Sequence, residues 1–180
     1  MAPSQTRLIE VDIAPQRLDF ADLTAAIAAA SDGDRIYLPG VKRWRAPAGG
    51  WQITKSLQIF GDGPGDPGTR IGTVLEPAAL GSDAFVLTPP AGANALGPVY
   101  LHDLMIANRE AVTPDGKNAI NIPLAPSQTL HSLRLERVAV INMSLEGLYL
   151  SSVARLTMKK VTVGACHSCG LQLTPWGWLT

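Results

Sequence analysis

Short runs of alternating apolar and polar residues cover most of the chain, and one arrangement of these runs repeats near its C-terminal end. Residues 133–142 carry apolar side chains at Leu133, Leu135, Val138 and Val140, and a second apolar run follows at 147–150. Both runs return 23 residues later, at 156–165 and 170–173. Alternation of this kind is typical of half-buried strands. Two short strands per period, joined by polar turns, predict one coil of a stacked solenoid.

The same register can be followed backward along the chain. Three apolar positions recur in a first strand column, at Leu101, Leu104 and Ile106, then Leu135, Val138 and Val140, then Met158, Val161 and Val163. Ile53, Leu57 and Ile59 fit this column with a one-residue difference in the first gap. A second strand column is predicted at 85–87, 119–122, 148–150 and 171–173.

The spacing between coils is not constant. Leu101 and Leu135 are 34 residues apart, so we expect an insertion of 11 residues, either in 109–117 or in 123–129, which are polar or proline-rich. Ile53 and Leu101 are 48 residues apart, which fits two coils or one coil with a long excursion through 61–73. The pattern therefore predicts about five coils.

The N-terminal part of the chain carries a helical pattern. Residues 1–18 are predicted to be an irregular lead-in segment, and 19–180 to form one domain. A helix is expected over 19–31, with Asp19 as its N-cap and Asp22 in its first turn. Its apolar stripe consists of Leu23, Ala26, Ile27 and Ala30. We expect this helix to cover the apolar side chains at the open end of the first coil.

Residues 21–40 resemble the capping helix and first strand of the pectate-lyase-like superfamily, and 51–63 are similar to its first full coil. The resemblance implies an all-β fold: a short, single-stranded, right-handed parallel β-helix of about five coils with an N-terminal capping α-helix. Members are usually longer, so the chain is similar to the N-terminal coils of such a protein or to a minimal version. The superfamily includes polysaccharide lyases, hydrolases, epimerases, phage tailspikes and non-catalytic binding modules, and its fold does not select among them.

Composition narrows the choice of partners. The 15 basic and 15 acidic side chains cancel, so nothing global favours nucleic acid or an anionic membrane. No apolar run reaches the roughly 18 residues of a membrane span, and the first residues lack an apolar signal region. Either the protein stays where it is made, or a signal preceded this sequence.

Two polar columns flank the predicted strands, His102, Glu136 and Lys159 in one and Asp103, Arg137 and Lys160 in the other. They permit two interpretations. A carboxylate beside Lys and Arg can bind uronates, and in the lyases that the chain resembles an Arg or Lys removes a proton beside a carboxylate neutralised by calcium. This makes Asp103, Glu136, Arg137, Lys159 and Lys160 weak catalytic candidates. We favour the other interpretation, a ladder of opposite charges between coils.

Other motifs give weaker signals. Gly63, Gly65 and Gly68 form a GxGxxG string, but no helix follows, so a turn is expected. Asp62 and Asp66 in this turn are weak candidates for calcium binding, and no cofactor is predicted unless the protein is a calcium-dependent lyase. Cys166 and Cys169 have CxxC spacing without a second ligand pair, which favours one buried thiol and one turn thiol, or else a local disulfide, over zinc.

Tryptophans suggest a carbohydrate site, because sugars bind flat apolar rings flanked by hydrogen-bonding groups. Arg43, Trp44, Arg45 and Trp51 are the candidates, with packing of both indoles over the helix cap as the alternative. Residues 176–178, Trp-Gly-Trp, are expected to cover the last coil or to bury against a second subunit.

The sequence therefore favours a non-catalytic β-helix module that binds a polysaccharide or glycan surface, or that is structural, in a tailspike-like or surface-associated setting. The alternative is a minimal or truncated lyase, hydrolase or epimerase that acts on an acidic polysaccharide.

Overall fold

The computed structural model describes residues 8–10, 22–40, 43–65, 72–78, 82–108, 117–168 and 170–174. Within these ranges the chain forms one short helix and sixteen strands. The helix is α1 (Leu23–Ala29). The strands are β1 (Leu8–Glu10), β2 (Arg35–Leu38), β3 (Arg43–Arg45), β4 (Trp51–Ile53), β5 (Gln58–Gly61), β6 (Val74–Glu76), β7 (Phe85–Leu87), β8 (Ala95–Leu96), β9 (Val99–Ala107), β10 (Ile120–Ile122), β11 (Thr129–Leu130), β12 (Leu133–Ile141), β13 (Leu148–Ser151), β14 (Leu156–Lys159), β15 (Thr162–Gly164) and β16 (Leu171–Thr174).

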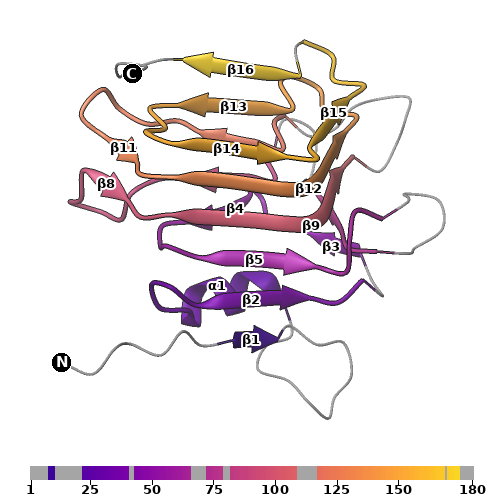
Figure 1. The fold of residues 1–180 in the computed structure, drawn as a ribbon, viewed down its shortest axis with the longest axis horizontal. Helices are drawn as coiled ribbons and strands as arrows, with labels where there is room; N and C mark the ends of the chain where they lie inside the picture. The colour runs from indigo at the N-terminus through magenta and orange to yellow at the C-terminus, as the bar shows by residue number, and fades with distance from the viewer. Residues whose placement is uncertain are drawn as a thin grey trace.

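All pairing between these strands is parallel, and it assembles stacked sheets (Figure 1). The largest sheet runs in the order β1-β2-β5-β9-β12-β14, with β3, β6 and β15 attached beside this path. A five-stranded sheet runs β4-β7-β10-β13-β16, and β8 pairs with β11 in a small third sheet. Parallel neighbours far apart in sequence require crossover connections, so the described residues form a solenoid-like, mostly β arrangement with one short helix.

The largest sheet contains two stacks because its long strands bend. The first half of β9 pairs with β5 and its second half with β6, while β12 pairs in the same way with β14 and β15. The bend falls at Asp103 and Arg137, whose φ angles are 57° and 50°. This left-handed conformation is costly for residues with a side chain, and it turns each strand from the first stack into the second.

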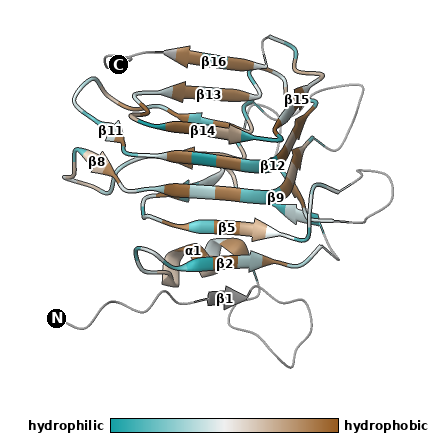
Figure 2. Ribbon diagram, in the orientation of Figure 1, coloured by the Kyte–Doolittle hydropathy of each residue, from teal (hydrophilic) through white to brown (hydrophobic). Residues whose placement is uncertain are grey.

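The main core cluster lies between the two stacks and the five-stranded sheet, and its residues are apolar. Each strand turns alternate residues inward, as in β12, where Leu133, Leu135, Val138 and Val140 are buried. Figure 2 shows the corresponding alternation of hydrophobic and hydrophilic residues along β12. Because the side chains of a strand alternate between its two faces, the intervening residues must point away from this core.

Helix α1 closes the N-terminal end of the stack. Leu23, Ala26 and Ile27 are its buried residues and belong to the main core cluster. The predicted N-cap was wrong: Asp22, and not Asp19, caps the helix, because the Asp22 side chain accepts a hydrogen bond from the Ala25 amide at 2.8 Å. Asp19 itself lies outside the described residues, as does almost all of the lead-in segment 1–18.

The predicted register is confirmed for the later strands. Leu101 pairs with Leu135 and Leu135 with Met158, and Ile120, Leu148 and Leu171 are successive partners in the five-stranded sheet. The placement of Ile53 was wrong. Ile53 pairs with Leu87 in the five-stranded sheet, whereas Ile59 is the partner of Leu101. Since β5 and β9 are direct neighbours, the long spacing before Leu101 is one layer with an excursion and not two layers.

Candidate binding face on the long sheet

The outward residues of the first stack form a polar and aromatic surface, which we call the ring face. One column of this face is formed by the first outward residue of each strand. Its members are Arg35, Gln58, Tyr100, Arg134 and Thr157. The neighbouring column is formed by the second outward residue of each strand. Its members are Tyr37, Phe60, His102, Glu136 and Lys159. Parallel pairing places successive members of a column about 4.8 Å apart.

Aromatic rings contact one another within and between the layers of this face. The His102 ring lies 5.0 Å from Phe60 and 4.4 Å from Tyr100, and Phe60 lies 5.3 Å from Tyr37. Guanidinium groups cover two of the rings, with Arg35 5.0 Å from the Phe60 centroid and Arg134 4.5 Å from that of Tyr100. Cation–π and ring contacts of this kind fix the side chains in place.

Glu136 is the centre of the polar network. Its side chain is only 6% exposed, yet three cations reach it: Arg134 and Arg137 at 2.6 Å and Lys159 at 3.2 Å. The Tyr100 hydroxyl donates a further hydrogen bond at 2.9 Å. The cations themselves remain open to solvent, because Arg134 is 49% exposed and Lys159 62% exposed. The buried carboxylate therefore anchors cationic groups whose outer sides face water.

Asp103 forms the second half of the network. The Arg137 guanidinium binds it with two nitrogens, Nε to Oδ1 and Nη2 to Oδ2, the latter at 2.6 Å. His102 Nδ1 lies 2.6 Å from the same Oδ2, and His102 Nε2 lies 2.7 Å from the Gln58 amide nitrogen. These two contacts fit an imidazole tautomer that donates from Nδ1 to the carboxylate and accepts at Nε2 from the Gln58 amide.

The network holds both carboxylates ionised. Hydrogen bonds from Tyr100, Arg134 and Lys159 lower the pKa of Glu136 to about 2. The Arg137 hydrogen bonds likewise lower the pKa of Asp103 below its usual value. The Asp103 carboxylate raises the pKa of Arg137, and burial together with the Glu136 hydrogen bond raises the pKa of Tyr100. Each proton therefore stays on the cation and off the carboxylate at neutral pH.

Four of the five predicted catalytic candidates thus meet in one network: Asp103, Glu136, Arg137 and Lys159. Lys160 follows Lys159 at the corner position equivalent to Arg137, with a φ of 54°, and its side chain is exposed. Sequence reasoning did not select Tyr100, Gln58 and Arg134. The alternation of the strands could have identified these three residues. Each is the sequence neighbour of a residue predicted to point inward, so its own side chain must point outward.

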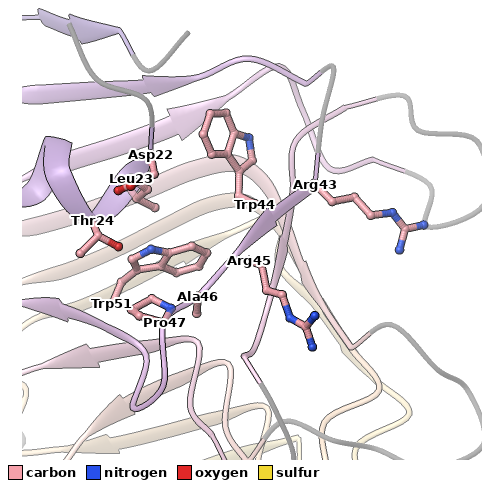
Figure 3. Close-up of a pocket in the computed structure, with 9 residues that line it drawn as sticks. All are labelled: Asp22, Leu23, Thr24, Arg43, Trp44, Arg45, Ala46, Pro47 and Trp51. Carbon is pink, nitrogen blue, oxygen red and sulfur yellow. The ribbon is translucent and has the colours of Figure 1, made fainter. Parts of the chain in front are cut away.

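The predicted carbohydrate residues lie elsewhere, around a pocket of about 230 Å³ beside helix α1. Arg43, Trp44, Arg45 and Trp51 all line it, together with Asp22, Leu23, Thr24, Ala46 and Pro47 (Figure 3). Trp44 is 3% and Trp51 2% exposed. In Figure 3 both arginine side chains extend away from the space between the two indoles. Arg43 binds Glu76 at 2.6 Å, and Arg45 donates to the Ala78 carbonyl oxygen.

Buried indoles offer little ring surface to a sugar. Trp51 packs against Phe85 with the ring centroids 5.3 Å apart, and Trp44 Nε1 donates to the Pro39 carbonyl oxygen at 3.2 Å. Their contacts connect the helix cap to the first layers of the core. These contacts are those of the packing alternative, and stacking of either indole on a sugar would require the cap to rearrange.

The candidates for metal binding are only partly described. Asp62 accepts hydrogen bonds from the Tyr37 hydroxyl and, at 2.7 Å, from the Gly40 amide, so its carboxylate fastens the turn to β2. Among the described residues, no three His, Cys, Asp or Glu side chains are grouped so that they could hold a metal ion. Asp66, Cys169, Trp176 and Trp178 lie outside these residues. Cys166 is half-buried, and its Sγ donates to the Gly164 carbonyl oxygen at 3.5 Å.

Comparison with known proteins adds no relative. No family of known proteins, no curated protein and no solved structure matches the chain. In the part of the chain that the structure describes, no helix has the length and apolar character needed to cross a membrane.

Proposed function

We propose that the chain is a short right-handed parallel β-helix of the pectate-lyase-like kind. The order of its strands supports about five coils, because the chain passes repeatedly from the first stack to the second and then to the five-stranded sheet. The passes are β2-β3-β4, β5-β6-β7, β9-β10, β12-β13 and β14-β15-β16. Right-handed connections between parallel strands of one sheet are the strong rule in proteins, which supports the handedness.

We propose further that this β-helix binds a glycan on its ring face without transforming it. The observation that carries this proposal is the buried Glu136 carboxylate, which fixes Arg134, Arg137 and Lys159 in place while their outer sides stay exposed. Cationic donors that are already immobile lose little further entropy when a ligand binds. Their spare N–H groups suit the many acceptor oxygens of a sugar chain, and those of an acidic one most.

The charge state of the same network disfavours a catalytic role for its residues. Glycoside hydrolysis requires one carboxyl group that keeps its proton until the bond breaks, which means a raised pKa. Both carboxyl groups here have lowered pKa values. A lyase that used Arg137 as its base would need a guanidinium that releases its proton, and Asp103 opposes that release by raising the pKa of Arg137.

Binding is tested with an array of neutral and acidic glycans. The variants Arg134→Ala and Lys159→Ala should each weaken binding of the best ligand about tenfold or more, the usual worth of a hydrogen bond to a charged group. Arg45→Ala is the matched control, since it removes an exposed cation beside the predicted tryptophan pocket. If only Arg45→Ala loses binding, the glycan site lies at that pocket and not on the ring face. If no glycan on the array binds the wild-type protein, the proposal is refuted.

A separate assay tests whether chemistry occurs. The protein is incubated with acidic and neutral polysaccharides, with and without calcium, and the release of unsaturated or reducing ends is measured. We expect no release above that of a Glu136→Gln, Arg137→Gln double variant. Release that depends on these two residues would establish the enzyme instead.

A further inference from the structure

Within the described residues, the last layer of the stack, at its C-terminal end, is apolar and open. Met158, Leu171 and Leu173 are 38%, 40% and 54% exposed, whereas their partners one layer earlier, Leu135, Leu148 and Leu150, are at most 2% exposed. Five further apolar residues of the last layer are half-buried against the core: Val153, Leu156, Val161, Val163 and Cys166. The last layer thus keeps the inward apolar pattern of an internal coil. Terminal repeats of a solenoid usually carry polar residues at such positions.

The strand edges at this end are open as well. Strands β14 and β16 are the last in their sheets, and β15 pairs only with β12 in the described part of the chain. Unpaired N–H and C=O groups beside exposed apolar side chains form a surface that pairs readily with another chain.

The two ends of the molecule differ, and this limits what can cover the open one. Helix α1 occupies the N-terminal end and buries Leu23, Ala26 and Ile27 there. A second copy that stacked its N-terminal end onto β14–β16 would therefore present α1 and β1 there, and not a layer of exposed inward apolar side chains. Figure 1 shows α1 and β16 at opposite ends of the stack. A contact between two like ends buries apolar side chains of both copies, and such a contact is closed by a two-fold axis.

We propose that two copies of this chain associate end to end through the last layer, with Met158, Leu171 and Leu173 at the centre of the interface. The two-fold axis makes facing edge strands antiparallel, so their free backbone groups can pair. Such a dimer exposes two ring faces, one on each copy. A surface that carries many copies of a glycan would then be bound with the gain of two linked contacts.

The association is tested by sedimentation velocity of the full chain over a range of concentrations. We expect twice the mass of one 19.0 kDa chain. Leu173→Arg should convert the dimer to a monomer, because two added charges would face each other in the interface. Met158→Arg should do the same from β14, and it keeps the test valid if Leu173→Arg does not fold. Circular dichroism and thermal melting identify variants that have lost their fold.

Ala28→Arg is the matched control, since it adds a charge to the exposed side of α1 at the opposite end. We expect it to remain dimeric. A wild-type chain that is monomeric at all concentrations would overturn the proposal and would indicate that residues of the same chain cover the open end. Open-ended polymers, or a dimer that Ala28→Arg disrupts, would overturn it too. None of these outcomes depends on glycan binding, so this proposal and the proposed function fail separately.

Discussion

At the scale of single residues, Glu136 shows how the stack uses a buried charge. A carboxylate that is 6% exposed would be costly without partners. Three cations and the Tyr100 hydroxyl compensate it, and they arrive from three successive layers, β9, β12 and β14. The charge therefore ties neighbouring layers together and fixes their register, because a shift of one residue would separate it from its partners.

The lowered pKa values of Glu136 and Asp103 predict acid sensitivity. A carboxyl group with a lowered pKa in the folded state stabilises the fold above its unfolded pKa, and this contribution is lost as the pH falls. For Glu136 the loss should run from the ordinary value of 4.5 down to about 2. Urea unfolding between pH 6 and pH 2 measures it. A Glu136→Gln variant should be less stable at pH 6 and show a flatter profile; an unchanged profile would contradict the network.

Lys55 closes the C-terminal end of helix α1. Its Nζ donates to the carbonyl oxygens of Ile27, Ala28 and Ala30, at 3.1, 2.8 and 2.7 Å. These carbonyls lie in the last turn, where a helix leaves acceptors unpaired and where positive charge is favoured. Lys55→Met should therefore lower the free energy of unfolding by about 1–3 kcal/mol. Denaturant unfolding measures this, and Lys160→Met, an exposed lysine of the opposite end, should change it little.

At the scale of strands, alternation decides which substitutions the fold tolerates. Val138 on β12 is 1% exposed and points into the core, whereas Thr162 on the neighbouring β15 is exposed. Val138→Asp would bury a carboxylate without a partner, so we expect a loss of about 4 kcal/mol or more and failure to fold cooperatively. Thr162→Asp should change stability by less than about 0.5 kcal/mol. Thermal melting compares the two, and a stable Val138→Asp protein would refute the register.

The strand pattern also explains which parts of the fold the sequence could predict. The recurring sets of three apolar residues indicate which side chains point inward. The column through Leu101, Leu135 and Met158 was therefore predicted correctly. They do not report which sheet a strand joins, and Ile53 was therefore placed in the wrong one. The charge pairs Asp103–Arg137 and Glu136–Lys159 follow from the register alone. The contact of Tyr100 with Glu136 does not, because it depends on how far a long side chain reaches across a layer.

At the scale of the whole molecule, the protein is a one-dimensional stack in which each layer contacts only its neighbours. The stability of such a stack is close to a sum over layers and the interfaces between them. Among the described residues, internal layers have two interfaces, and the last layer has one. Its inward side chains accordingly change from fully buried in β13 to half-exposed in β16, although both strands carry leucines at the same positions. Local opening should therefore begin at the C-terminal end.

Amide hydrogen exchange, measured by mass spectrometry, tests this gradient. Exchange should be slowest in β9, β10 and β12, which have paired strands on both sides, and fastest in β14–β16. The N-terminal strand β4 should be protected better than β16, because α1 covers its end of the stack. If two copies associate through the last layer, protection of β14–β16 should rise with protein concentration, while that of β4 stays constant. Uniform protection along the stack would contradict the layer-by-layer account of stability. A gradient of protection that does not depend on protein concentration would agree with that account and would contradict the proposed dimer.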